Sequence, residues 1–144
     1  MPARCTLATL LGLLFGACQL IAPYSQTAYQ QTTALKAEAL ILMDQATEPY
    51  ALHKTEAEQV RLDMEKAYEY AKGRPHNEFS TKQWEIVRDP VRHSIGGFLA
   101  RWQTEGALNA TFVTEAKKLV SDQLDAISAL ESGKPHPGGG GQPE

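Results

Sequence analysis

Apolar residues recur at three- and four-residue intervals along most of the chain, which is the spacing of one face of an α-helix. In residues 26–46 the recurring positions are Ala28, Leu35, Ala39, Leu42 and Ala46. Ser25 stands where a helix N-cap is expected, and Pro49 ends the segment because proline disfavours helical geometry in the residue before it. The pattern therefore predicts a first helix over residues 26–46.

A second helix is predicted over residues 50–72. Its apolar face consists of Val60, Met64, Ala67 and Ala71. The remaining faces carry closely spaced charged residues, which is typical of a surface in contact with water. Gly73 suits the end of this helix, and Pro75 prevents its continuation.

Residues 79–95 are compatible with two structures. Ser80 and Gln83 have the spacing of a capping box, which favours a short helix that ends before Asp89-Pro90. Apolar residues also alternate on both sides of Asp89-Pro90, which fits a small hairpin. The capping pattern makes the helix our preferred prediction, and the hairpin stays open as the alternative.

Gly96-Gly97 is expected to form a flexible turn ahead of another helix. The apolar stripe of that helix consists of Ile95, Phe98, Leu99 and Trp102, and Gly106 closes it. Asn109 then has the character of an N-cap for a last helix over residues 110–130. The predicted core face of this helix consists of Phe112, Ala116, Leu119, Gln123, Ile127 and Leu130, joined by Val120 and Leu124.

Together these segments predict a mainly α fold, a small helical bundle of four to five helices over residues 25–131. Trp84, Trp102 and Phe112 are expected to be the bulkiest members of its core. Residues 132–144 contain prolines and a run of four glycines, a composition that cannot form a packed core. We therefore predict a disordered tail over residues 132–144.

The first seventeen residues have the layout of a secretory signal peptide. Residues 1–4 supply a basic side chain and the free amine, residues 5–15 form an apolar stretch, and Gly16 and Ala17 are small. A helix needs about 20 residues to cross a hydrocarbon core of ~30 Å, so this apolar stretch is too short to span a membrane.

Leu13-Leu14-Phe15-Gly16-Ala17-Cys18 resembles the lipobox of bacterial lipoprotein precursors. The resemblance covers residues 1–18 and implies that residues 1–17 are a signal peptide and that Cys18 is the lipid attachment residue. Residues 18–24 would then be a lipidated N-terminus followed by a short spacer. Two alternatives remain: an uncleaved signal anchor with a buried Cys18 thiol, and a chance match in a cytosolic protein.

The resemblance also implies a location. A multi-acyl anchor would hold the chain on the membrane, because stable anchoring takes more than one acyl chain. Gln19 stands where an Asp would favour retention at the inner membrane, so in a bacterium with two membranes the periplasmic face of the outer membrane is favoured. The expected partners are the membrane, through the covalent lipid, and proteins of the cell envelope.

Loss of residues 1–17 leaves 13 basic and 17 acidic residues, a formal charge of −4. A mildly acidic chain without a clustered basic surface is a poor match for nucleic acid. If the resemblance holds, Cys5 would leave with the signal peptide and Cys18 would be acylated, so the mature domain would have no disulfide. Its stability must come from its apolar core.

Residue patterns for catalysis, cofactor binding or metal ligation do not stand out. His53, His76, His93 and His136 are scattered one to a segment, without the local pairs of metal sites. Gly-x-Ser-x-Gly is missing from the sequence, and the clustered carboxylates follow one helix instead of facing each other across a cleft. We predict no catalytic, cofactor-binding or metal-binding residues.

The leading functional hypothesis is a non-enzymatic binding or scaffolding module that is anchored to the bacterial envelope. One alternative is an enzyme acting on cell wall or lipid, which would require residues such as Glu56, Tyr70, His93 and Ser94 to meet in one cleft. Another alternative is an assembly factor of a secretion system similar in general plan to helical pilotins. The oligomeric state stays open.

Overall fold

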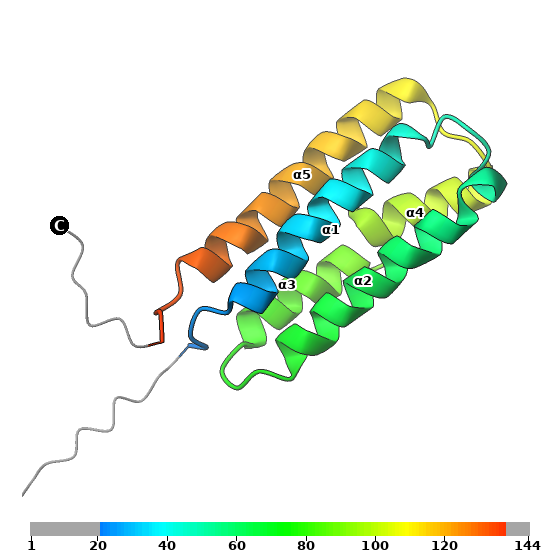
Figure 1. Cartoon of the computed structure of the whole chain (residues 1–144). Helices are drawn as coiled ribbons and strands as arrows, with labels where there is room; N and C mark the ends of the chain where they lie inside the picture. Colours follow the sequence, from blue (N-terminus) through cyan, green and yellow to red (C-terminus); the bar gives the residue numbers. More distant parts are fainter. Residues whose placement is uncertain (1–20, 138–144) are drawn as a thin grey trace, which may run out of the picture.

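The computed structural model describes residues 21–137, and these residues form five α-helices and one short 3-10 helix without any strand (Figure 1). The elements are α1 (Gln26–Asp44), η1 (Tyr50–Leu52), α2 (Lys54–Lys72), α3 (Glu78–Arg88), α4 (Ile95–Glu105) and α5 (Ala110–Ser132). The mainly α fold is confirmed, and the hairpin alternative for residues 79–95 is wrong. The predicted signal peptide and Cys18 lie outside the described residues.

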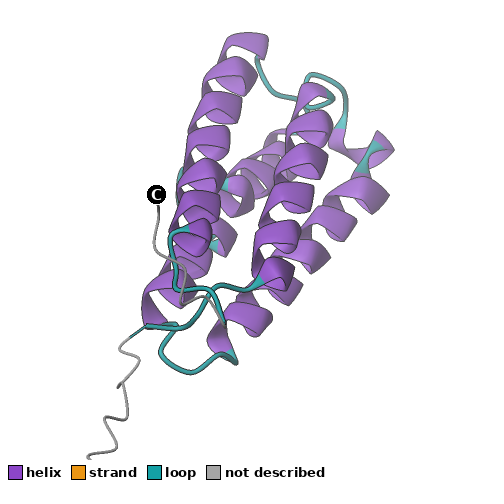
Figure 2. Ribbon diagram, turned by 60° about the vertical axis from the view of Figure 1, so that its left-hand side comes forward, coloured by secondary structure: helices purple, strands orange, loops and turns teal. Residues whose placement is uncertain are grey.

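The helices occupy the four positions of an antiparallel bundle, with the connections gathered at its two ends (Figure 2). α1 packs against both α2 and α5, while α3 packs against α2 and α5 from the other side. α3 and α4 follow one another along the bundle and share its third position (Figure 1). The architecture is therefore a four-helix bundle whose third helix is broken.

The break between α3 and α4 lies at Asp89-Pro90. The Asp89 carboxylate accepts a hydrogen bond from the Val91 amide at 2.9 Å, and the Asp89 carbonyl accepts one from Ser94 Oγ at 3.3 Å. A Cβ atom on Gly97 would lie 1.8 Å from the Arg92 carbonyl oxygen. Gly96 and Gly97 are therefore part of the first turn of α4, where the chain passes close to itself, and the predicted flexible turn is wrong.

The core is centred on Trp102, which is fully buried. The Tyr50 ring meets the Trp102 ring edge to face at 5.4 Å, and the indole N–H donates to the Glu48 carbonyl at 3.0 Å. Trp84 is also buried, as predicted. The predicted stripes on α2 and α4 are buried as well, namely Val60, Met64, Ala67, Ala71, Ile95, Phe98, Leu99 and Trp102.

The predicted caps at Ser25, Gly73, Gly106 and Asn109 are found in the structure, whereas the predicted starts of α2 and α3 are not. Ser25 Oγ accepts from the Ala28 amide and Asn109 Oδ1 accepts from the Thr111 amide, so both predicted N-caps are confirmed. α2 begins at Lys54, after η1, instead of at residue 50. α3 begins at Glu78, so Ser80 lies inside the helix, where its hydroxyl accepts a hydrogen bond from Lys134 instead of capping.

Both ends of the described chain meet at one end of the bundle (Figure 1). The Ala22 amide donates to the His76 carbonyl at 2.8 Å, and the Tyr24 amide donates to the Pro135 carbonyl at 2.7 Å. Residues 21–24, predicted as a spacer, are thus held against the loop after α2 and the segment after α5.

A buried polar cluster joins these segments, and we call it the terminal clasp: Arg74, Asn77, Ser80, Glu131 and Lys134. The Lys134 ammonium donates to Asn77 Oδ1 at 2.6 Å, to Ser80 Oγ at 2.9 Å and to Glu131 Oε2 at 2.6 Å. The second carboxylate oxygen of Glu131 accepts from Arg74 Nη1 at 3.0 Å. A buried ion pair is stable only when its other hydrogen-bonding positions are filled, and the clasp fills them.

Lys134 is 3 % exposed, although it belongs to the segment predicted to be disordered. The Tyr24 and His136 rings also lie 4.4 Å apart, which ties the segment to the start of the fold. The prediction of a disordered tail is therefore wrong for residues 132–137, because the clasp supplies the partners that the composition alone does not reveal. Residues 138–144 lie outside the described residues.

Candidate functional site

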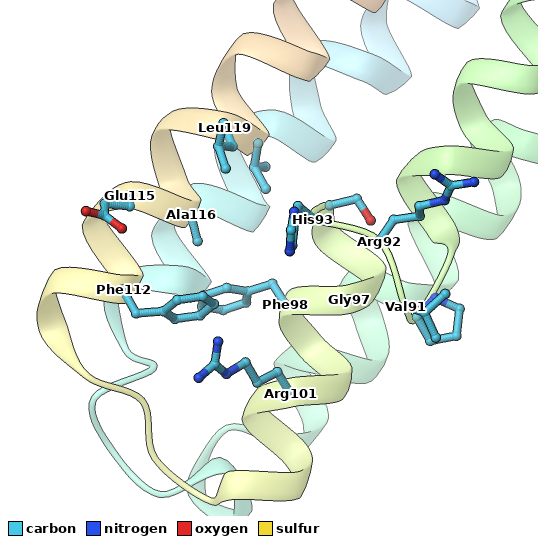
Figure 3. A pocket seen from close by; sticks show the side chains of 13 residues that line it. Val91, Arg92, His93, Gly97, Phe98, Arg101, Phe112, Glu115, Ala116 and Leu119 are labelled. Atoms are coloured by element: carbon cyan, nitrogen blue, oxygen red, sulfur yellow. The ribbon is translucent and has the colours of Figure 1, made fainter.

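A groove of about 380 Å³ lies beside the break in the third helix, between α4, α5 and the connection that carries residues 90–94 (Figure 3). The break leaves α4 apart from the middle of α5, so the two helices do not close over each other there. We call this hollow the α4/α5 groove. Its apolar lining consists of Val91, Phe98, Phe112, Ala116 and Leu119.

An aromatic pair forms the floor of the groove. The Phe98 and Phe112 rings are stacked, with centroids 6.1 Å apart and planes inclined by 3°. Phe98 is buried and its ring is also 6.4 Å from the Trp102 ring, so the pair is fixed to the core. This contact holds the floor in place when the groove is empty.

Charged side chains border the aromatic pair. The Arg101 guanidinium lies 4.1 Å from the Phe112 ring centroid, while Arg101 Nε is 2.8 Å from Glu105 Oε1. Figure 3 shows Arg101 on one side of the stacked rings and His93 on the other, with Glu115 on α5 nearby. An apolar floor with a charged rim suits an amphipathic ligand.

Two groove residues were predicted to belong to the core and do not. Leu119 is 54 % exposed, and Phe112 is only partly buried. Val120, Leu124 and Ile127 are buried as predicted, and Val113 is buried with them. The predicted face is therefore wider than the face that α5 buries. The sequence does contain a sign of this, because the apolar arc of α5 is wider than one packing interface requires.

A second hollow of about 590 Å³ lies along α1 and α2. Its apolar part contains Ile41, which is 67 % exposed, with the buried residues Leu42 and Val60. Ile41 is therefore outside the face that α1 buries in the core. The side chains of Glu38, Gln45, Glu56 and Gln59 also line this hollow, although most of its exposed surface is apolar.

The residues that an enzyme hypothesis required do not meet. His93 and Ser94 line the α4/α5 groove, whereas Glu56 lines the hollow on α1 and α2. The Tyr70 hydroxyl is 2.8 Å from Ser25 Oγ at the clasp end of the bundle. The Ser94 side chain is buried and hydrogen-bonded to the Asp89 carbonyl.

The histidines are also dispersed in the structure. His53 Nε2 is 2.8 Å from Glu48 Oε2, His136 lies against Tyr24, and His93 is in the groove. Over residues 21–137, no group of three or more His, Cys, Asp or Glu side chains is placed to hold a metal ion.

Within the same residues, none of the helices combines the length and the apolar character that a membrane crossing requires. Comparison with protein-family models, curated proteins and solved structures gives no match.

Proposed function

We propose that this protein is a lipid-anchored, non-enzymatic binding module of the bacterial envelope, and that the α4/α5 groove is its binding site. The anchor is the lipobox-like segment that ends at Cys18. The ligand is the apolar face of an amphipathic helix in an envelope protein. One observation carries this proposal: a fixed Phe98–Phe112 pair at the floor of a groove that leaves Leu119 exposed.

The dimensions of the groove support a helical ligand. Its lining on α5 runs from Phe112 to Val120, which spans about 12 Å at 1.5 Å per residue. A partner helix places apolar side chains at positions i and i+7 about 10 Å apart on one face, so two anchors fit this length. The charged rim would then contact polar residues beside those anchors.

Anchoring and binding reinforce each other in this proposal. A partner in the same membrane meets the groove at a raised effective concentration, so a moderate affinity is sufficient. The ionisable groups at the groove are Arg92, His93, Arg101 and Glu115, and they stand on its rim instead of converging on one point. This arrangement favours binding over catalysis. Escort of a secretion-system subunit is one narrower form of the same activity.

Site-specific photocrosslinking in cells tests the proposal. A photoreactive amino acid replaces Leu119 in one variant and Leu62 in the control, because Leu62 is similarly exposed, at 49 %, but lies on α2 outside the groove. We expect a discrete protein adduct at position 119 only, with the crosslinked partner peptide forming an amphipathic helix. Equal adducts at both positions, or a lipid adduct alone at position 119, would contradict the proposal.

A further inference from the structure

We infer that the clasp end of the bundle lies directly on the phospholipid surface, with Phe79 at the level of the headgroups. This inference rests on the proposed anchor at Cys18. Its structural basis is independent of the groove: the start of the fold is fixed by hydrogen bonds, and the apolar side chains nearby are exposed.

Only a short stretch of chain separates the proposed anchor at Cys18 from the ordered body of the protein. Ala22 is 1 % exposed, and its amide is hydrogen-bonded to the His76 carbonyl, so the ordered body begins at this residue. Four residue steps separate Cys18 from Ala22, and an extended chain covers about 14 Å in four steps. The headgroup layer is itself roughly 5–7 Å thick on each side of the bilayer, so little chain remains to hold the bundle away.

The clasp end of the bundle exposes apolar and aromatic side chains. Phe79 is 63 % exposed and lies in the first turn of α3, next to the loop that contains His76. Side chains in a helix lean toward its N-terminus, and the N-terminus of α3 is at the clasp end, so the Phe79 ring leans toward the membrane. Ile21 and Tyr29, also exposed, belong to the same end.

The residue types at this end suit a membrane–water interface. Tyr24 and Tyr29 have ring centroids 6.5 Å apart, and Ile21 and Phe79 are exposed at the same end of the bundle. Aromatic residues with a polar atom favour the membrane–water interface, and apolar side chains gain free energy by entering the boundary of the acyl chains.

This orientation also determines the height of the α4/α5 groove. At 1.5 Å per residue, Leu119 lies about 20 Å and Phe112 about 30 Å along α5 from Ser132 at the clasp end. The groove then stands clear of the headgroups and opens toward partners that project a comparable distance from the membrane.

Fluorescence from a dye at one position tests the inference in the acylated, mature protein. The protein is reconstituted into vesicles of phosphatidylethanolamine and phosphatidylglycerol. Phe79→Cys carries a polarity-sensitive dye, and Leu52→Cys is the matched control, since Leu52 is 67 % exposed at the opposite end of the bundle. The leader takes Cys5 with it and Cys18 is acylated, so the introduced thiol is the one that reacts.

We expect the dye at position 79 to shift its emission to the blue and to be quenched by a lipid with a nitroxide near its headgroup. The dye at position 52 should show neither effect. Vesicle flotation is measured in parallel: protein that does not float lacks the anchor, which contradicts the proposed function. Protein that floats while positions 79 and 52 give equal emission overturns this inference alone. Helical circular dichroism verifies that both variants are folded.

Discussion

Lys134 Nζ and Glu131 Oε2 are 2.6 Å apart, and both side chains are almost completely buried. Glu131 also accepts from Arg74 and from the Ser25 amide, so one carboxylate joins both ends of the ordered chain to the loop after α2. A buried charge without its partner costs several kcal/mol, whereas here the Glu131 carboxylate pairs with both the Lys134 ammonium and the Arg74 guanidinium. The clasp therefore controls whether the two end segments stay docked.

Removal of the Glu131 carboxylate should be the most damaging change to the clasp. Glu131→Ala leaves both Lys134 and Arg74 without their acidic partner, and we expect a loss of about 3–5 kcal/mol in the free energy of unfolding. Lys134→Ala should cost less, because Arg74 still pairs with Glu131. Urea denaturation measures both values. Truncation after Pro137 is the control and should leave stability unchanged; losses below 1 kcal/mol for Glu131→Ala would refute a stabilising clasp.

The break in the third helix depends on a close approach at Gly97. Gly97→Ala would place a methyl group on the Arg92 carbonyl oxygen, so the backbone must shift, at a cost of about 1–3 kcal/mol. Gly133→Ala is the control, because its Cβ would come no nearer than 3.3 Å to the Ala129 carbonyl oxygen. In thermal denaturation, the melting temperature of Gly97→Ala should be clearly lower than that of Gly133→Ala. The reverse order would mean that the chain does not pass close to itself here.

Leu119→Asp should separate binding from stability. Leu119 is exposed, so the charge should change the free energy of unfolding by no more than about 0.5 kcal/mol. An ionised carboxylate in the apolar groove should nevertheless abolish capture of the partner that crosslinks at this position. Leu62→Asp on α2 is the matched variant and should retain capture. Retained capture by Leu119→Asp would place the binding site elsewhere.

The stability of the fold should depend on pH through the Asp63 carboxyl. Burial acts to raise the pKa of this carboxyl, but hydrogen bonds from Lys66 and Gln59, together with the Lys66 charge, lower it below its ordinary value of 3.8. The resulting stabilisation is present above the unfolded pKa and disappears as the pH falls through the lowered value. We expect Asp63→Asn to be less stable than the native chain at pH 6, with the gap closing below pH 3.8. A gap that does not change with pH would contradict this assignment.

Much of the fold could be predicted from the sequence because it is determined locally. The stripe of Val60, Met64 and Ala67 has helical spacing, and Asn109 caps the turn that directly follows it. These features depend on residues within one or two helical turns. They remain the same whichever neighbour the helix contacts, so the bundle of helices was predictable and a hairpin over residues 79–95 was the wrong alternative.

The groove and the clasp depend on distant partners, which local patterns do not specify. Leu119 and Val120 are adjacent apolar residues on α5, and the placement of the neighbouring helices leaves Leu119 exposed while Val120 is buried. Lys134 is buried because Asn77 and Ser80, more than fifty residues earlier, fill its hydrogen-bonding positions. A lysine in a Pro/Gly-rich segment otherwise indicates a solvated chain.

The identity of residue 18 in the processed protein tests the account most directly. A clickable fatty acid is fed to cells that express the native chain or Cys18→Ser, and protein extracted from membranes is analysed by intact mass. We predict an N-terminus at Cys18 that carries a diacylglycerol thioether, with label on the native chain and none on the serine variant. Equal labelling of both chains, or soluble protein with its leader attached and a free Cys18 thiol, would contradict a membrane-anchored binding module.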